Sequence, residues 1–270
     1  MRELAASLAC ALDPVAFAES LGFAPDSWQA NVLRSTGKRL LLNCSRQAGK
    51  STTAAVLALH CAIYFQASLI LLVSPSLRQS SELFRKVIEG LDKLPNKPEV
   101  KEDNKTTLTL GNGSRIVSLP GSEGTVRGYS GATLIIEDEA SRVDDALYYS
   151  VRPMLAVSGG RLILMSTPFG KRGHFHAEWT GQGSWGRVQI PATECPRISQ
   201  AFLDEERAAL GEWWFRQEYL CEFSETTDSL FSYEQISAAF DDKVQPLFAS
   251  NGGLPGITTA VQPLQIGVVS

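Results

Sequence analysis

Residues 39–52 read Arg39-Leu-Leu-Leu-Asn-Cys44-Ser-Arg-Gln-Ala-Gly-Lys50-Ser-Thr52 and carry two structural signals in succession. The first six residues form a short apolar run that is typical of a buried strand. The next eight match the end of the phosphate-binding pattern G-x-x-x-x-G-K-[ST], although Cys44 stands where the first glycine is expected. Because backbone N–H groups at the start of a helix attract anions, this stretch predicts a phosphate-binding loop.

The pattern assigns expected roles to the residues of this loop. Gly49 is its second glycine. Lys50 is expected to reach the β- and γ-phosphates of a nucleotide, and the Ser51 hydroxyl is expected to hold Mg²⁺. ATP and Mg²⁺ are therefore the predicted cofactors. The residues expected to bind the nucleotide here are Ser45, Arg46, Gln47, Ala48, Gly49, Lys50, Ser51 and Thr52.

Outward from the loop, apolar runs alternate with helical patterns. We expect buried strands at residues 39–44, 68–74, 133–137 and 161–166, and helices at 50–65, 75–94 and 144–155. Residues 100–119 predict β-structure with a turn at Gly111-Asn112-Gly113. This alternation indicates an α/β fold, with a mostly parallel sheet covered by helices on both faces.

The two ends of the chain differ from this central pattern. Residues 4–34 predict short helices with start signals at Asp13 and Asp26, and residues 199–223 predict a small helical subdomain. The alternation in His174-Phe175-His176 predicts side chains on one strand face, without enough ligands for a zinc site. After Phe240 the chain becomes rich in Pro, Gly, Ser and Thr, which predicts a poorly ordered linker.

Polar side chains end two of the predicted strands. Asp138 is expected to coordinate Mg²⁺, and Glu139 to polarise an attacking water. Acidic residues after a strand also cap helices, and the residues alone leave that alternative open. Ser166, Thr167 and Pro168 follow another strand at the same carboxyl edge of the sheet, where ligands bind in α/β folds. They fit either a γ-phosphate sensor or a plain strand-to-turn transition.

Composition sets further limits. The 270 residues are 44% hydrophobic and 20% charged, as in ordinary soluble globular proteins. The net charge of −4 means that DNA binding would need a local basic patch. Five scattered cysteines indicate free thiols in a reducing compartment. The longest apolar run, residues 54–65, is too short to cross a bilayer, so no membrane partner is expected.

Taken in order, these motifs resemble the large terminase subunit of tailed bacteriophages, over residues 20–232 or so. That family has a deviant phosphate loop with an Arg-Gln pair, as in Arg46-Gln47, and an Asp-Glu-Ala motif, as in Asp138-Glu139-Ala140. Its coupling motif is similar to Ser166-Thr167-Pro168. Its adenine-reading Q motif is similar to Trp28-Gln29. The segments at residues 215–223 and 229–231 look like the end of its ATPase region.

The resemblance implies a P-loop NTPase of the RecA/ASCE type that hydrolyses ATP to move viral double-stranded DNA into a procapsid. It implies catalytic roles for Glu139 and Lys50, and an arginine finger that is either Arg46 or, from the neighbouring subunit, Arg127. It also implies a portal protein, a small terminase subunit and a homo-oligomeric ring as partners. The expected location is the host cytoplasm.

The resemblance also divides the chain. We expect residues 1–232 to form the ATPase domain, and residues 233–270 to be a linker that ends in the start of a nuclease domain. No Asp or Glu follows Asp242, so no two-metal nuclease site is expected here. Two alternatives stay open: a catalytically compromised remnant that binds ATP or packaging partners, and a helicase-like ATPase.

Overall fold

The computed structural model describes residues 2–120, 126 and 128–225. Arg127 and the expected linker at residues 233–270 lie outside the described residues, and so does the expected domain boundary at 232. The fold and the site below concern the described residues alone.

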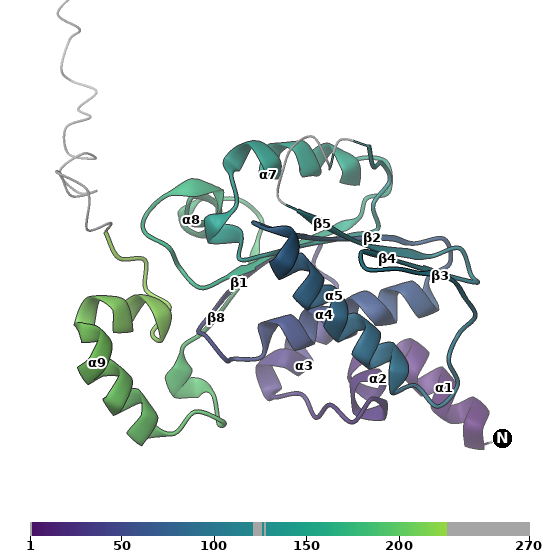
Figure 1. Cartoon of the computed structure of the whole chain (residues 1–270), viewed down its shortest axis with the longest axis horizontal. Helices are drawn as coiled ribbons and strands as arrows, with labels where there is room; N and C mark the ends of the chain where they lie inside the picture. The colour runs from purple at the N-terminus through teal and green to yellow at the C-terminus, as the bar shows by residue number, and fades with distance from the viewer. Residues whose placement is uncertain (1, 121–125, 127, 226–270) are drawn as a thin grey trace, which may run out of the picture. The chain divides into compact units, whose positions relative to one another are not determined.

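One eight-stranded sheet forms the centre of the fold, with strand order β3-β4-β5-β2-β6-β7-β1-β8 (Figure 1). The strands from β5 to β8 in this order pair in parallel, whereas β3 and β4 are antiparallel. The strand bounds are β1 Arg39–Cys44, β2 Leu69–Ser74, β3 Val100–Asp103, β4 Thr107–Leu110, β5 Arg115–Pro120, β6 Leu134–Asp138, β7 Arg161–Ser166 and β8 Gly186–Ile190. The mostly parallel sheet predicted from the sequence is confirmed.

Helices cover both faces of this sheet (Figure 1). Strand residues alternate between two cores: Ile70 and Leu72 pack with α2–α5, and Leu71 and Val73 pack with α7 and α8. The α-helix bounds are α1 Arg2–Leu12, α2 Pro14–Ser20, α3 Ser27–Arg34, α4 Lys50–Tyr64, α5 Leu77–Asp92, α7 Asp145–Val151, α8 Gly173–Thr180 and α9 Gln200–Glu218. Short 3-10 helices are η1 Ala140–Arg142, η2 Arg152–Leu155 and η3 Ala192–Glu194.

Local sequence signals explain several of the helix starts. The Asp13 side chain accepts a hydrogen bond from the Val15 N–H and caps α2. Asp26 forms a capping box with Gln29 at the start of α3. Both positions are the start signals expected from the sequence.

The structure differs from the sequence prediction in three places. His174-Phe175-His176 lies in helix α8 rather than on a strand, since Phe175 and Trp179 sit one helical turn apart and pack on the same core. The strand β8 has no counterpart in the prediction, because it is a largely exposed edge strand without an apolar run. The helix expected at 199–223 is kinked at Gly211, where φ is 76°, and ends at Glu218.

Candidate nucleotide site

The phosphate loop joins β1 to α4, as its sequence predicts. Cys44 is the last residue of β1, and Gly49 occupies the N-cap of α4 with a φ of 95°. This left-handed backbone requires glycine, and a Cβ on Gly49 would also lie 2.6 Å from the Gln29 amide nitrogen. Cys44 is extended strand, and that conformation suits a residue with a side chain. This explains how the chain dispenses with the first glycine of the pattern.

A cavity of about 450 Å³ lies at this loop. Its lining contains four cationic side chains and a single carboxylate, that of Glu139. Such a charge balance favours a ligand with several negative charges. The lining residues are Arg46, Gln47, Gly49, Lys50, Ser51, Thr52, Gln79, Lys86, Glu139 and Arg142.

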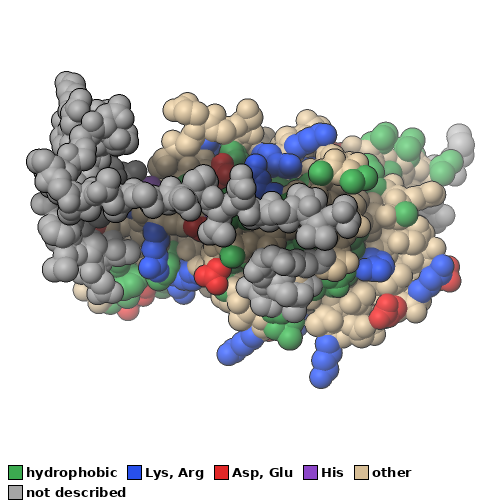
Figure 2. Space-filling view, turned by 90° about the horizontal axis from the view of Figure 1, so that it is seen from above, with side chains coloured by type: hydrophobic (Ala, Val, Ile, Leu, Met, Phe, Trp, Pro, Cys, Tyr) green, Lys and Arg blue, Asp and Glu red, His purple; other side chains and the backbone are tan. Residues whose placement is uncertain are grey.

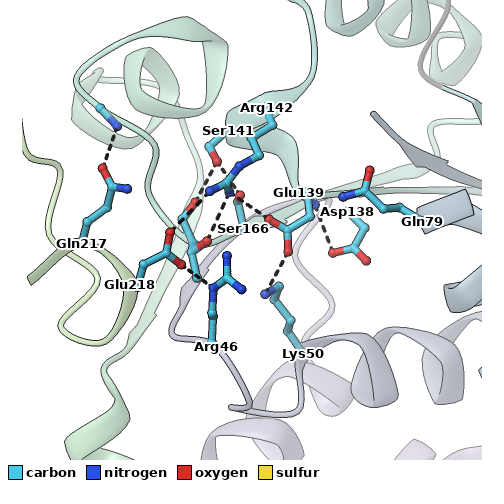
Figure 3. Close-up of polar contacts among 12 residues, drawn as sticks. Arg46, Lys50, Gln79, Asp138, Glu139, Ser141, Arg142, Ser166, Gln217 and Glu218 are labelled. Atoms are coloured by element: carbon cyan, nitrogen blue, oxygen red, sulfur yellow. Dashed lines mark hydrogen bonds and ion pairs between the residues drawn. The ribbon is translucent and has the colours of Figure 1, made fainter. Parts of the chain in front are cut away.

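The acidic pair lies at the carboxyl end of β6, opposite the loop lysine (Figure 3). Lys50 Nζ is 3.2 Å from Glu139 Oε1. The Glu139 backbone adopts a left-handed conformation, with φ 54° and ψ 41°, and its N–H donates to Asp138 Oδ1. Left-handed backbone conformations of residues other than glycine are strained, and they are common at functional sites. The predicted partners Lys50, Asp138 and Glu139 are therefore adjacent in the fold.

Burial and charge shift the pKa of two of these groups in ways that matter for metal and phosphate. Burial, reinforced by the Glu139 charge, raises the pKa of Asp138 to about 6 despite the nearby Lys50. For Lys50, burial lowers the pKa, but the Glu139 and Asp138 carboxylates more than offset this, and the pKa lies above its usual value. Lys50 is thus a retained cation, although its side chain is only 10% exposed.

Two residues without a predicted role extend this network to α9 (Figure 3). Arg142 Nη1 lies 3.2 Å from Glu139 Oε2, and Arg142 Nη2 lies 3.4 Å from Glu218 Oε1. The second oxygen of Glu218 lies 2.6 Å from Arg46 Nε. Glu218 therefore joins the phosphate loop to the residues after β6. Arg142 follows Glu139 by three residues, one turn of 3-10 helix, and that spacing is the only signal in the sequence that could have pointed to it.

The predicted coupling residues lie beside this network. Ser166, Thr167 and Pro168 are all buried. The Ser141 hydroxyl lies 2.6 Å from Ser166 Oγ and donates to the Thr167 carbonyl at 2.7 Å. Gln217 of α9 accepts from the Gly170 N–H at 3.3 Å. The segment after β7 is therefore hydrogen-bonded to both the η1 turn and α9.

Trp28 and Gln29 lie behind the loop rather than in the cavity lining. Gln29 is fully buried, and its Oε1 accepts from the Asp26 N–H. Its amide nitrogen would contact any side chain at Gly49, and Arg197 donates to the Ala48 carbonyl next to it. Gln29 thus supports the phosphate loop. Its contact with adenine stays a prediction.

A second polar cluster, centred on the buried pair His174 and Glu137, lies on the opposite face of β6. Both ring nitrogens of His174 face carboxylates: Nε2 is 2.6 Å from Glu137 Oε1 and Nδ1 is 3.0 Å from Asp145 Oδ1. Tyr148 stacks on the imidazole with ring centroids 4.4 Å apart. Ionised carboxylates only accept hydrogen bonds, so this arrangement favours the doubly protonated ring. Glu137 is fully buried, so its carboxylate belongs to this cluster and does not face solvent.

The His174 cluster predicts a pH-dependent stability. Burial lowers the pKa of His174, but Glu137 and Asp145 raise it further and leave it above its usual value. A raised pKa contributes stability below the unfolded value of about 6.5, and that stability is lost as the pH rises through the folded value. We expect His174→Asn to lower the free energy of unfolding by about 3 kcal/mol at pH 6, and by less at pH 9.

Urea unfolding of the purified wild type and variant at pH 6 and pH 9 measures the loss of unfolding free energy at each pH. His60→Asn is the matched control, because burial lowers the pKa of His60 and its pH dependence therefore has the opposite sign. A loss of unfolding free energy for His174→Asn that is larger at pH 9 than at pH 6 would contradict the assignment of a buried imidazolium.

The sheet order, the loop between β1 and α4 and the acidic end of β6 define a RecA-like P-loop NTPase fold. Over residues 41–238 the chain matches the family described as the N-terminal region of the terminase large subunit, T4likevirus-type. The chain belongs to this family, and the resemblance found in its sequence is confirmed.

Individual relatives agree with this assignment. The chain is 27% identical over 252 residues to the terminase large subunit of Thermus phage G20c, covering 80% of this chain and 52% of that protein. It thus spans about half the length of the curated relatives it matches. The large terminase ATPase domain of Thermus phage P74-26 has the same fold, with a TM-score of 0.68 at 22% identity over 77% of this chain and 97% of that one.

A further solved structure, the large terminase of a thermophilic bacteriophage in complex with ADP, aligns with a TM-score of 0.61 at 12% identity. The alignment covers 74% of this chain and 54% of that chain. At this identity the similarity concerns the fold.

Proposed function

We propose that this chain hydrolyses ATP and uses the energy to move double-stranded viral DNA into a procapsid. The observation that carries the proposal is the cavity at the phosphate loop, whose lining contains four cationic side chains and one carboxylate, that of Glu139. A triphosphate and a water-activating base need this arrangement. Membership of the terminase large subunit family supports the packaging role.

The proposed reaction begins with binding of the triphosphate to the loop. Lys50 moves from Glu139 Oε1 to the β- and γ-phosphates, which uncovers that oxygen. Glu139 then accepts a proton from the attacking water as the water oxygen bonds to the γ-phosphorus. The bond from the γ-phosphorus to the bridging oxygen breaks, ADP keeps the electron pair, and inorganic phosphate is released.

Ser51 and Asp138 would hold Mg²⁺. The acidic and hydroxyl donors fit this ion, which prefers one or two carboxylates together with phosphates and waters. When bound, the ion would neutralise charge on the β- and γ-phosphates. Since Asp138 has a pKa of about 6, proton and metal would compete for it in mildly acidic solution.

Several finer roles complete the proposal. Trp28 and Gln29 would read the adenine, and Ser166, Thr167 and Pro168 would couple hydrolysis to movement. Arg46 lines the cavity and is a candidate arginine finger within the subunit. Arg127, whose position lies outside the described residues, is the candidate for a finger that acts on a neighbouring subunit.

The proposed partners are DNA, a portal protein and a small terminase subunit, with the chain working as a homo-oligomeric ring in the host cytoplasm. Figure 2 shows Lys and Arg side chains in several separate places on one face. A ring would bring such side chains from several subunits to one DNA duplex. Among the described residues, no helix has the length and apolar character that a membrane span requires.

A steady-state ATPase assay with and without procapsid portal and double-stranded DNA tests the proposal. We expect Mg²⁺-dependent release of phosphate from ATP that increases when portal and DNA are present. Binding of ATP without hydrolysis under both conditions would overturn the motor function and favour a catalytically inactive remnant.

A further inference from the structure

Arg142 lies at the end of η1, directly after the acidic end of β6, and its guanidinium is held from several sides. It stacks over the Phe169 ring at 4.4 Å, and its side chain is only 26% exposed. Nη1 is 3.5 Å from Thr167 Oγ1 as well as 3.2 Å from Glu139 Oε2, and Nη2 faces Glu218. An arginine with this many partners has a fixed orientation.

The two oxygens of the Glu139 carboxylate have different partners (Figure 3). Lys50 contacts Oε1, and Arg142 contacts Oε2. In the proposed reaction Lys50 transfers to phosphate, so Oε1 is released while Oε2 keeps its partner. A carboxylate that loses one ion pair and keeps the other retains its orientation. A catalytic base held in a fixed orientation increases the reaction rate by a large factor.

We propose that Arg142 is a positioning residue for hydrolysis: it orients the Glu139 carboxylate and ties it to Thr167 of the coupling segment and Glu218 of α9. The inference rests on the proposed function. We assign Arg142 this role and not that of an arginine finger because both of its terminal nitrogens face protein oxygens of the same subunit, on three different residues. A movement of α9 or of the coupling segment would therefore shift Arg142 and, through it, the Glu139 carboxylate.

The first test measures kcat, KM and the Kd for a fluorescent ATP analogue. We expect Arg142→Gln to lower kcat by about 10²-fold, because a misplaced base slows chemistry. Kd should rise by less than about tenfold, since Arg142 is one of four cations in the lining and both its terminal nitrogens face protein oxygens. Arg142→Lys, which cannot bridge two carboxylates in one plane, is expected to lower kcat by about tenfold. Arg172→Gln is the matched control, because Arg172 stacks on the same Phe169 ring at 4.5 Å, and its kcat should equal that of the wild type.

A double-variant cycle separates positioning from a structural role. If Arg142 acts through Glu139, adding Arg142→Gln to Glu139→Gln lowers the single-turnover rate no further. An additional loss in the double variant, or a wild-type kcat in either Arg142 variant, would overturn the inference. Thermal unfolding shows whether Arg142→Gln folds. If Arg142→Gln does not fold, the same measurements are made on Arg142→Lys.

Mixing subunits locates the action of Arg142. Arg142→Gln mixed with Lys50→Ala should show no more hydrolysis than the two variants apart, because Arg142 serves the site of its own subunit. Recovery in the mixture would overturn the inference. If the wild type does not hydrolyse ATP, the proposed function and this inference are both overturned. If the wild type hydrolyses ATP and the Arg142 variants do so equally well, only the inference is overturned.

Discussion

Glu139→Gln is expected to bind ATP and to hydrolyse it about 10²- to 10⁴-fold more slowly than the wild type, because an amide cannot accept the proton of the attacking water. The substitution keeps the size of the side chain but removes the ion pairs to Lys50 and Arg142. Lys50 then no longer has to leave a carboxylate in order to reach phosphate. ATP affinity should therefore be equal to that of the wild type or higher.

Phosphate release and equilibrium binding of a fluorescent ATP analogue measure the two effects separately. Glu82→Gln is the matched control, since it makes the same chemical change at an exposed helix position paired with Arg85. Hydrolysis by Glu139→Gln at a rate close to the wild type would contradict the assignment of Glu139 as the base.

Lys50→Ala is expected to weaken ATP binding by roughly 10- to 150-fold, corresponding to the loss of a charge-assisted hydrogen bond of about 1.5–3 kcal/mol. Lys50 is expected to reach the β- and γ-phosphates, so AMP binding should be nearly unchanged. Hydrolysis should fall below detection, because the variant loses both phosphate contact and transition-state charge. Removing Lys50 also leaves the Asp138 and Glu139 carboxylates without their shared cation.

Titration calorimetry with ATP and AMP distinguishes these effects. Lys97→Ala serves as the control, because it removes a lysine that is half exposed and paired with Asp92. Equal loss of affinity for ATP and AMP would indicate general damage to the loop rather than a lost phosphate contact.

The central part of the fold could be predicted because its signals are local. Buried parallel strands appear as continuous apolar runs, and β1 and β7 have the bounds that these runs predict. The phosphate loop has a fixed spacing, and Gly49 and Lys50 take the positions that it requires. By contrast, His174-Phe175-His176 is too short a pattern to separate helix from strand, and β8 is an edge strand with few buried residues.

The candidate site could be predicted only in part, for the same reason. Lys50, Asp138 and Glu139 come from motifs with known spacing, and the carboxyl edge of a parallel sheet brings the ends of β1 and β6 together. Arg142 belongs to no such motif, and the segment at residues 215–223, which contains Glu218, predicts no role for this residue. They are brought together by the packing of α9 against the loop, and no spacing in the sequence describes a contact between residues 76 positions apart.

The sequence by itself therefore determined the order of the motifs: a strand, a phosphate loop and an acidic pair, in the order typical of the P-loop NTPase fold. Only the tertiary structure decided how the acidic pair is held, with Lys50 on one oxygen of Glu139 and Arg142 on the other. The physical reason is that motif residues are constrained by local backbone geometry, whereas their partners are selected by packing between elements distant along the chain.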